Sequence, residues 1–271
     1  MALSFRLDMH VDPSELQKQL AIGQHSRQAE EFAERYRELD SSIYRSCFAY
    51  SRWRLDALLD RYLPQGGEGR RLLDVGCGTG HHMASLCKRG FEVAGVDGSE
   101  EMIAHARANN PGAQIECSDV DHLPFADGSF DFVLCVEVLR YLPDFTRCIN
   151  EIARVLKPGG VCLVTATPLL NLNGYWLVNR MAGLLRIGGF VHLKQFFTTS
   201  RRLRRSFAAA GFVSPTLHGV YLGPINWVER LAPSLLPRTL KAWEPVDSAN
   251  ADRKVIREFS NMFLVHGVRG S

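Results

Sequence analysis

The spacing of apolar residues separates an N-terminal helical part from the rest of the chain. Within residues 14–62 apolar side chains recur at helical intervals, for example at Phe32, Tyr36 and Leu39. The sequence PQGGEG at 64–69 combines a proline with glycines and is expected to end this part. We therefore predict that a helical segment precedes the core of the protein.

Short apolar runs alternate with helical patterns after this break. The runs RLLDVG, FEVAGVD, AQIECSD, SFDFVLCVEV and VCLVTATP predict five strands. The sequences GHHMASLCKRG, SEEMIAHARANN and FTRCINEIARVLKPGG predict helices, and the last is expected to end at Pro158-Gly159-Gly160. This alternation is typical of a parallel sheet with helices on both faces, and the strands are apolar throughout, as such a sheet requires. We therefore predict an α/β fold.

The pattern becomes irregular after Pro168. Residues 169–197 are apolar with interspersed Gly and Asn, and residues 224–252 are irregular and rich in Pro and Trp. Between these stretches we expect a helix and a sixth strand, and NMFLVHGVR predicts a last strand. We predict an N-terminal helical lid at 1–66 and a core at 67–271, with cap insertions at 169–197 and 224–252.

Composition narrows the class of protein. With 271 residues and 46% hydrophobic content the chain can bury one sizeable core, and a formal net charge of +3 does not indicate a dedicated polyanion binder. Seven cysteines without a CxxC pair indicate neither a disulfide framework nor a zinc site, and we expect no metal. Free thiols fit a reducing cytoplasm, and we see neither a secretory signal nor a run of about 20 apolar residues. We expect a cytoplasmic protein without a transmembrane segment.

The stretch LLDVGCGTG at 72–80 carries the strongest chemical signal. A strand that runs into a glycine loop and a helix forms a ligand site at the strand's carboxyl end. A phosphate loop of the nucleotide-hydrolase kind would end in Gly-Lys-Ser/Thr, and a dinucleotide loop would follow GxGxxG. Here Gly76, Gly78 and Gly80 are spaced GxGxG instead. The third candidate ligand is S-adenosylmethionine.

Four motifs together resemble the class I S-adenosylmethionine-dependent methyltransferases. LLDVGCGTG is similar to the family's first motif, GVDGS to its second, CSDVDHLPFADGSFDFVLCVEVLRYLPD to the stretch around its third and fourth strands, and RVLKPGGVCLVTA to the entry of its fifth strand. They occur in family order over residues 72–166. The subgroup most resembled methylates small molecules, quinones and lipid- or sugar-linked intermediates. The resemblance implies a Rossmann-like, doubly wound sheet of seven strands, mostly parallel with an antiparallel last strand.

The resemblance also implies how the cofactor is held. Asp74 would bind the methionine ammonium, directly or through water, and the backbone N–H groups of Gly78 to Gly80 would face the methionine carboxylate. Asp97 would accept the ribose hydroxyls, and Asp119 would reach the exocyclic amine of adenine. Gly98 departs from the bulkier apolar residue usual in the family, so adenine would pack more on Met102. The expected cofactor-binding residues are Asp74, Gly76, Cys77, Gly78, Gly80, Asp97, Gly98, Met102, Asp119, Val120 and Cys135.

The expected reaction is in-line displacement at the sulfonium methyl by an oxygen or nitrogen of a small, partly hydrophobic acceptor, which leaves S-adenosylhomocysteine. Most of the acceleration would come from positioning the reactants and excluding water. The segments outside the sheet pattern are expected to form the acceptor pocket, with Tyr44, Tyr175, Trp176 and Trp227 as substrate-binding residues. The candidates for a general base are His192 first, then Glu137 and Tyr141, with His218 also considered.

Two alternatives differ in class from a small-molecule methyltransferase. One is a non-catalytic member of the fold that binds the cofactor and serves a partner protein. The other is an RNA methyltransferase, for which the arginine-rich sequence SRRLRRS at 200–206 is the support. As a helix this sequence places its arginines opposite Leu203 and Phe207, on the solvent side. No aromatic stacking platform interleaves with them, so no nucleic acid is expected as a partner.

Overall fold

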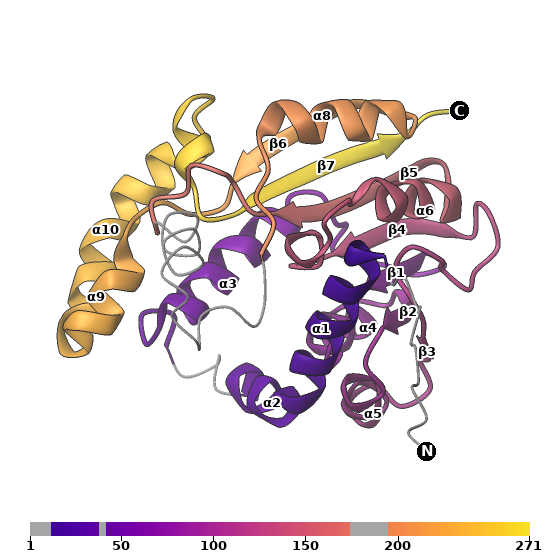
Figure 1. Cartoon of the computed structure of the whole chain (residues 1–271), viewed down its shortest axis with the longest axis horizontal. Coiled ribbons are helices and arrows are strands. Elements are labelled where there is room, and N and C mark those ends of the chain that lie inside the picture. Colours follow the sequence, from indigo (N-terminus) through magenta and orange to yellow (C-terminus); the bar gives the residue numbers. More distant parts are fainter. Residues whose placement is uncertain (1–11, 38–41, 174–194) are drawn as a thin grey trace, which may run out of the picture.

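The computed structural model describes residues 12–37, 42–173 and 195–271 of the chain (Figure 1). A seven-stranded sheet in the order β3-β2-β1-β4-β5-β7-β6 forms its centre. The strands are β1 (Arg71–Val75), β2 (Glu92–Asp97), β3 (Gln114–Cys117), β4 (Phe130–Cys135), β5 (Leu156–Ala166), β6 (Phe212–Gly219) and β7 (Phe263–Arg269). The doubly wound, mostly parallel sheet predicted from the sequence is thereby confirmed.

The order of the strands places a ligand site at the centre of one sheet edge. From β1 the chain moves outward to β2 and β3, and it then returns to the other side of β1 at β4. β1 to β5 are parallel neighbours, whereas β7 lies between β5 and β6 and is antiparallel to both. The carboxyl ends of β1 and β4 therefore flank the point where the winding direction changes, which is where open α/β sheets bind ligands.

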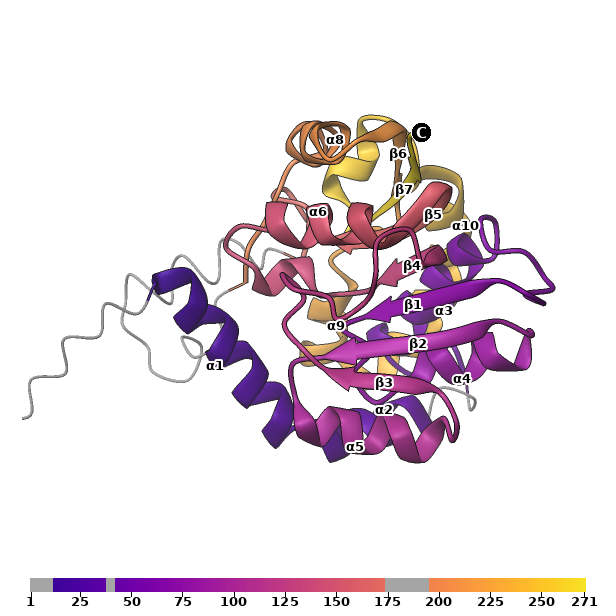
Figure 2. The same ribbon diagram turned by 90° about the vertical axis from the view of Figure 1, so that its right-hand side faces the viewer.

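Helices cover both faces of the sheet and one of its ends. The long helices are α1 (Pro13–Arg27), α2 (Ala29–Arg37), α3 (Cys47–Leu59), α4 (His81–Lys88), α5 (Glu100–Asn109), α6 (Thr146–Val155), α8 (Ser200–Ala209), α9 (Ile225–Leu231) and α10 (Leu236–Asn250). Short 3-10 turns are η2 (Leu139–Tyr141), η3 (Pro233–Leu235) and η4 (Ile256–Phe259). Figure 2 shows α1 lying across the ends toward which the β1, β2 and β3 arrows point.

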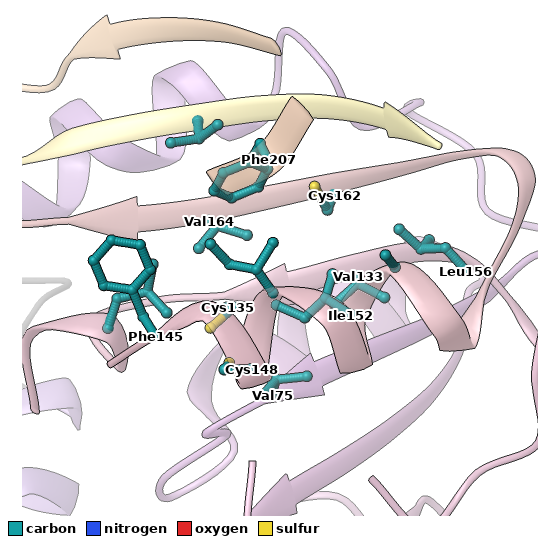
Figure 3. Packing of buried hydrophobic residues seen from close by; sticks show 14 of the residues in the cluster. Val75, Val133, Cys135, Phe145, Cys148, Ile152, Leu156, Cys162, Val164 and Phe207 are labelled. Carbon is teal, nitrogen blue, oxygen red and sulfur yellow. The ribbon is translucent and has the colours of Figure 1, made fainter. Parts of the chain in front are cut away.

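Alternate residues of β1 supply the two halves of the core. Leu72 and Leu73 are both fully buried but belong to different clusters, because successive side chains of a strand point to opposite faces. Leu73 packs on the side of α6 and α8, part of which Figure 3 shows, and Leu72 packs on the side of α3, α4 and α5. The helices therefore cover both faces of the strands that carry the site.

Two element predictions were wrong near prolines. The helix expected to reach Pro158-Gly159-Gly160 ends at Val155, and β5 starts at Leu156. Pro158 disfavours helical geometry in the residue before it, so the chain turns extended there. Residues 224–252, expected to be irregular, contain α9, η3 and α10. Pro233 and Pro237 stand in the first turns of η3 and α10, where proline is well tolerated.

No helix among the described residues is both long and apolar enough to cross a membrane.

Candidate cofactor and acceptor site

A cavity of about 180 Å³ lies at the carboxyl ends of β1, β2 and β4, under α1 and α2. Nine of the eleven residues predicted to bind the cofactor line this cavity: Asp74, Gly76, Cys77, Gly78, Asp97, Gly98, Met102, Asp119 and Val120. They come from β1 and β2, from the loops that follow β1, β2 and β3, and from helix α5. The fold therefore gathers most of the predicted set into one place.

Asp74 stands in this cavity as a buried carboxylate with an unsatisfied oxygen. Its side chain is on β1, only 2% of the residue is exposed, and Oδ2 has no hydrogen-bond partner among the residues that the structure describes. Burial, reinforced by the charge of Asp97 and opposed by Arg52, raises the pKa of Asp74 to about 7. A buried acceptor of this kind is costly unless a donor reaches it, so the site fits a ligand that carries a cationic N–H group.

The glycine loop presents open backbone to the same space. Gly78 has φ of +54°, and a Cβ there would meet no protein atom within 4 Å. Its N–H donates to Asp97 Oδ2 at 2.9 Å, and the N–H of Ser99 donates to Oδ1 at 3.0 Å. Burial raises the pKa of Asp97, although these backbone bonds oppose the shift. The carboxylate of Asp97 is therefore oriented by the loop, and each of its two oxygens keeps a lone pair that can accept from a ligand.

Gly80 and Cys135 do not line the cavity, contrary to expectation. A Cβ on Gly80 would stand 2.3 Å from Asn110 Nδ2, so close packing against α5 accounts for this glycine. Cys135 is fully buried in the cluster on the α6 side, where Figure 3 shows it beside Cys148. Because alternate residues of β4 face opposite sides, its thiol cannot reach the ligand site. A role of these two residues in cofactor binding stays a prediction that the lining of the cavity does not support.

Helix α1 closes one end of the cavity through contacts with residues predicted to bind adenine. Lys18 is largely buried, and its Nζ lies 2.6 Å from Asp119 Oδ2 and 3.0 Å from Asp121 Oδ2. Ile22 occupies the space over Gly98, since a Cβ on that glycine would lie 2.8 Å from Ile22 Cδ1. The apolar bulk that Gly98 lacks is therefore supplied by a residue far away in the sequence.

A buried arginine on α3 connects α2 to residues that follow the strands. The Arg52 guanidinium donates to the Tyr36 hydroxyl at 2.7 Å and approaches His82 Nε2 at 3.0 Å. An arginine can only donate, so Nε2 of His82 accepts, and burial followed by the charge of Arg52 holds the pKa of His82 well below its usual value. Tyr36 also stacks on His81 at 4.4 Å between ring centroids. All four of these side chains line the cavity.

Glu137 follows β4 with an unusual backbone conformation. Its φ is +60°, and its N–H donates to Thr165 Oγ1 at 2.6 Å. Its carboxylate accepts from Arg140 at 2.7 Å and from Arg52 at 3.4 Å. Burial opposes the charge of this carboxylate, but the two guanidinium groups outweigh that effect and lower the pKa of Glu137. Such a carboxylate is a weak proton acceptor, so the geometry favours a positioning role over the predicted role as base.

His25, which was not singled out from the sequence, faces the same cavity from α1. Its Nδ1 lies 2.8 Å from the carbonyl oxygen of Ala21, which can only accept, so Nδ1 carries the hydrogen. With the hydrogen on Nδ1, the lone pair of the imidazole is on Nε2, for which no described residue supplies a hydrogen bond. The ring packs against Tyr141 at 4.8 Å and Phe32 at 5.6 Å between centroids. Burial raises the pKa of Tyr141, so its phenol stays protonated as a donor.

Other residues predicted to meet the acceptor do not lie at this cavity. The Tyr44 hydroxyl is hydrogen-bonded to Glu244 on α10, and Trp227 lies on the outer side of α9. Neither lines the cavity, because α9 and α10 pack on α3 and do not reach across the strand ends. His218, on β6, is hydrogen-bonded to Tyr62 and Asp252 and also lies outside the cavity. Three further candidates, His192, Tyr175 and Trp176, lie outside the described residues.

Comparison with known proteins identifies the site's chemistry. A family model described as "Methyltransferase domain" matches residues 73–164. The ubiquinone biosynthesis O-methyltransferase of Idiomarina loihiensis is 32% identical over 167 residues, which cover 58% of this chain and 68% of that protein. The chain belongs to the class I S-adenosylmethionine-dependent methyltransferase family. This methyltransferase is also 36% identical over 140 residues to the biotin biosynthesis bifunctional protein BioHC of Cellvibrio japonicus, covering 51% of the chain and 27% of that longer protein.

A solved structure supports the fold over nearly the whole methyltransferase. The magnesium protoporphyrin IX methyltransferase of Synechocystis, determined with S-adenosylhomocysteine bound, superposes with a TM-score of 0.59 at 15% identity, over 94% of this chain and all of that one. The cofactor of this family is S-adenosylmethionine. An ammonium group on its methionyl end fits the unsatisfied Oδ2 of Asp74, and the open backbone at Gly78 leaves room for it.

The cavity-lining residues that the sequence missed belong mainly to α1. Lys18, Ile22 and His25 follow one another at intervals of three and four along α1, so they share one helix face. That spacing was available in the sequence, but nothing in it says what the face covers. Arg52 stands in the sequence SRWR, where an arginine is equally consistent with an exposed helix position.

Proposed function

We propose that this methyltransferase transfers a methyl group to an oxygen or nitrogen of a small, partly hydrophobic acceptor. The observation that supports this proposal is the composition of the cavity. It is lined by two buried carboxylates and open backbone, and also by the rings of Phe32, Tyr36 and Tyr141. Flat aromatic surfaces suit an acceptor with an apolar body. The likeness to a quinone-pathway O-methyltransferase points to the same class of acceptor.

We assign the cofactor-holding roles as follows. Asp74 binds the methionyl ammonium, and Arg52 binds the methionyl carboxylate, because it is the buried cation on the same side of the cavity. Asp97 accepts from the ribose, and Val120, Met102 and Ile22 enclose the adenine. When bound, S-adenosylmethionine supplies an electrophilic methyl group on a sulfonium. The chain's own contribution is to orient the two reactants and to exclude water with α1 and α2.

His25 is the residue that we propose as proton acceptor. Its Nδ1–H is held by the Ala21 carbonyl, which leaves the basic Nε2 for an acceptor hydroxyl or amine in the cavity. Glu137 is already engaged by two arginines and is less suited to this role. Tyr141 packs edge to face against the His25 ring, and its hydroxyl can donate a hydrogen bond to the acceptor. His192 remains a candidate from the sequence.

His25→Ala is expected to lower kcat about a hundredfold and leave the affinity for S-adenosylhomocysteine within about threefold of the parent, because positioned proton transfer typically contributes at least this much. The measurement is steady-state turnover together with calorimetric binding. Added imidazole should restore part of the lost rate, whereas pyrrole, of similar size but not basic, should not. Equal rescue by both compounds, or an unchanged kcat, would show that His25 only packs.

The acceptor class can be tested by release of S-adenosylhomocysteine. Purified protein is incubated with S-adenosylmethionine and panels of hydroxylated aromatics, quinols, primary amines and structured RNA. Turnover with a phenolic or amine panel supports the proposal. Tight cofactor binding without turnover on any panel favours the non-catalytic alternative, and salt-sensitive turnover on RNA alone favours the RNA methyltransferase.

A further inference from the structure

The helical hairpin formed by α9, η3 and α10 directs all its acidic side chains inward. Glu229 accepts from the N–H of Cys47 at 3.0 Å, and Glu244 accepts from the hydroxyl of Tyr44. Asp247 is fully buried, where it accepts from the Tyr50 hydroxyl at 2.7 Å and pairs with Arg54 at 3.1 Å. These bonds fix the hairpin to α3, and they leave no carboxylate on its outer side.

The outer side of the hairpin combines large apolar side chains with cations. We call it the basic–apolar face, made of Trp227, Arg230, Leu231, Leu235, Arg238 and Lys241. Its apolar members are among the most exposed in the described protein, with 80% of Leu231, 52% of Leu235 and 40% of Trp227 accessible. The three cations are exposed, and none of them forms an ion pair with a described residue. Arg230 lies over the Trp227 ring at 6.0 Å.

The position of the basic–apolar face suits a large, external partner. Figure 1 shows α9 and α10 at the edge of the molecule opposite β3, beyond α3. Leu231 and Leu235 flank the corner at which the chain leaves α9, turns through η3 and enters α10. Both leucines at this corner are largely exposed to solvent. Exposed apolar groups gathered with one sign of charge mark an interaction site whose partner is apolar beneath and negative at its surface.

We infer that the basic–apolar face docks on the surface of an anionic phospholipid bilayer. Leu231 and Leu235 would enter the boundary between headgroups and acyl chains, and Trp227 would lie at headgroup level, where its amphipathic ring is favoured. Arg230, Arg238 and Lys241 would meet the lipid phosphates. A protein interface suits this face less well, since lysine is depleted from interfaces, whereas an anionic bilayer buries apolar side chains at its boundary and attracts the neighbouring cations.

The test is co-sedimentation of the full chain with vesicles of phosphatidylcholine, with and without phosphatidylglycerol. Binding is expected on the mixed vesicles only and should weaken as salt rises. The charge reversal Arg238→Glu with Lys241→Glu should lower partitioning by at least about tenfold, because each basic residue near an anionic surface contributes a factor of roughly five. Leu231→Asp with Leu235→Asp should abolish it. Trp227→Phe should remove a blue shift of tryptophan emission that vesicles induce.

A matched control separates this face from general charge. Arg201→Glu with Arg205→Glu makes the same charge change on exposed positions of α8 and should leave partitioning nearly unchanged. Equal loss in this control, binding to neutral vesicles, or no binding by the parent protein would each overturn the inference. So would a dimer that Leu231→Asp with Leu235→Asp dissociates in the absence of vesicle binding, because the face would then join two copies of the chain. Every variant should keep the parent affinity for S-adenosylhomocysteine, since none of these residues lines the cavity.

Discussion

Asp74→Asn is expected to weaken binding of S-adenosylmethionine and S-adenosylhomocysteine about a hundredfold and, at the same time, to stabilise the ligand-free protein. The carboxylate is buried, and its Oδ2 has no partner among the described residues. Removing one member of a buried charge pair costs a ligand about 2–5 kcal/mol. Asparagine has the same shape, so the cavity keeps its form and the loss reports the charge. Calorimetry with S-adenosylhomocysteine measures it.

The pH dependence follows from the raised pKa of Asp74. Burial lifts this pKa from its ordinary value near 4 to about 7, so the unfolded chain ionises the group more readily than the folded one. Stability of the ligand-free protein therefore falls as the pH rises from about 4 to about 7, and Asp74→Asn should remove that loss, with a melting temperature at pH 8 higher by about 3 °C or more. Ligand affinity should fall below about pH 7 in the parent and stay nearly flat in the variant.

Asp131→Asn provides a matched control at the other end of the neighbouring strand. Its carboxylate is satisfied by Lys157 at 2.8 Å and by the N–H of Arg71 at 2.9 Å, and these bonds outweigh burial to lower the pKa of Asp131. This variant should lose stability above about pH 4 and keep the parent ligand affinity. An Asp74→Asn protein that binds as tightly as the parent at every pH would remove Asp74 from the ammonium site.

The cofactor half of the site could be predicted because its signals are local. Asp74 and the glycines belong to one uninterrupted strand and loop, and Asp97 ends the next strand, so sheet topology alone brings them together. The location of Cys135 away from the cavity could also have been predicted. Val133 is a core residue of the same strand, and the two-residue period of a strand places Cys135 on the same face.

The remaining parts of the site depend on how distant helices pack. Lys18 meets Asp119 across 101 positions of sequence, and Ile22 fills the space above Gly98. Neither pairing follows from periodicity, which gives the face of α1 but not the surface beneath it. The prolines of 224–252 were misleading for a different reason. A proline is read from the sequence as a helix breaker, but Pro233 and Pro237 stand in first turns, where proline is well accommodated, and Pro245 lies within α10 without ending it.

Removal of residues 1–41 is expected to lower turnover by at least about a thousandfold while the sheet still folds. Neither hydrophobic cluster contains a residue that precedes Cys47, so α1 and α2 add little to the core. The truncation nevertheless removes Lys18, Ile22, His25 and Tyr36 from the cavity. It would open the site to water and remove both the adenine contacts and the proposed base. The reductions in rate caused by these losses multiply. Turnover and the melting temperature of the truncated protein measure the two parts of this expectation.

Hydrogen exchange distinguishes a closing lid from a helix that merely packs on the sheet. The amides of α1 should exchange more slowly once S-adenosylhomocysteine is added, because a lid must open for exchange of ligand and be held shut by it. Lys18→Met keeps the apolar stem of the side chain and removes the ion pairs to Asp119 and Asp121. It should speed exchange in the ligand-free protein and weaken ligand binding by about tenfold, since two carboxylates lose their shared cation. If the ligand leaves hydrogen exchange in α1 unchanged and the truncated protein keeps the parent turnover, α1 is a flanking helix. Water must then be excluded by another part of the chain.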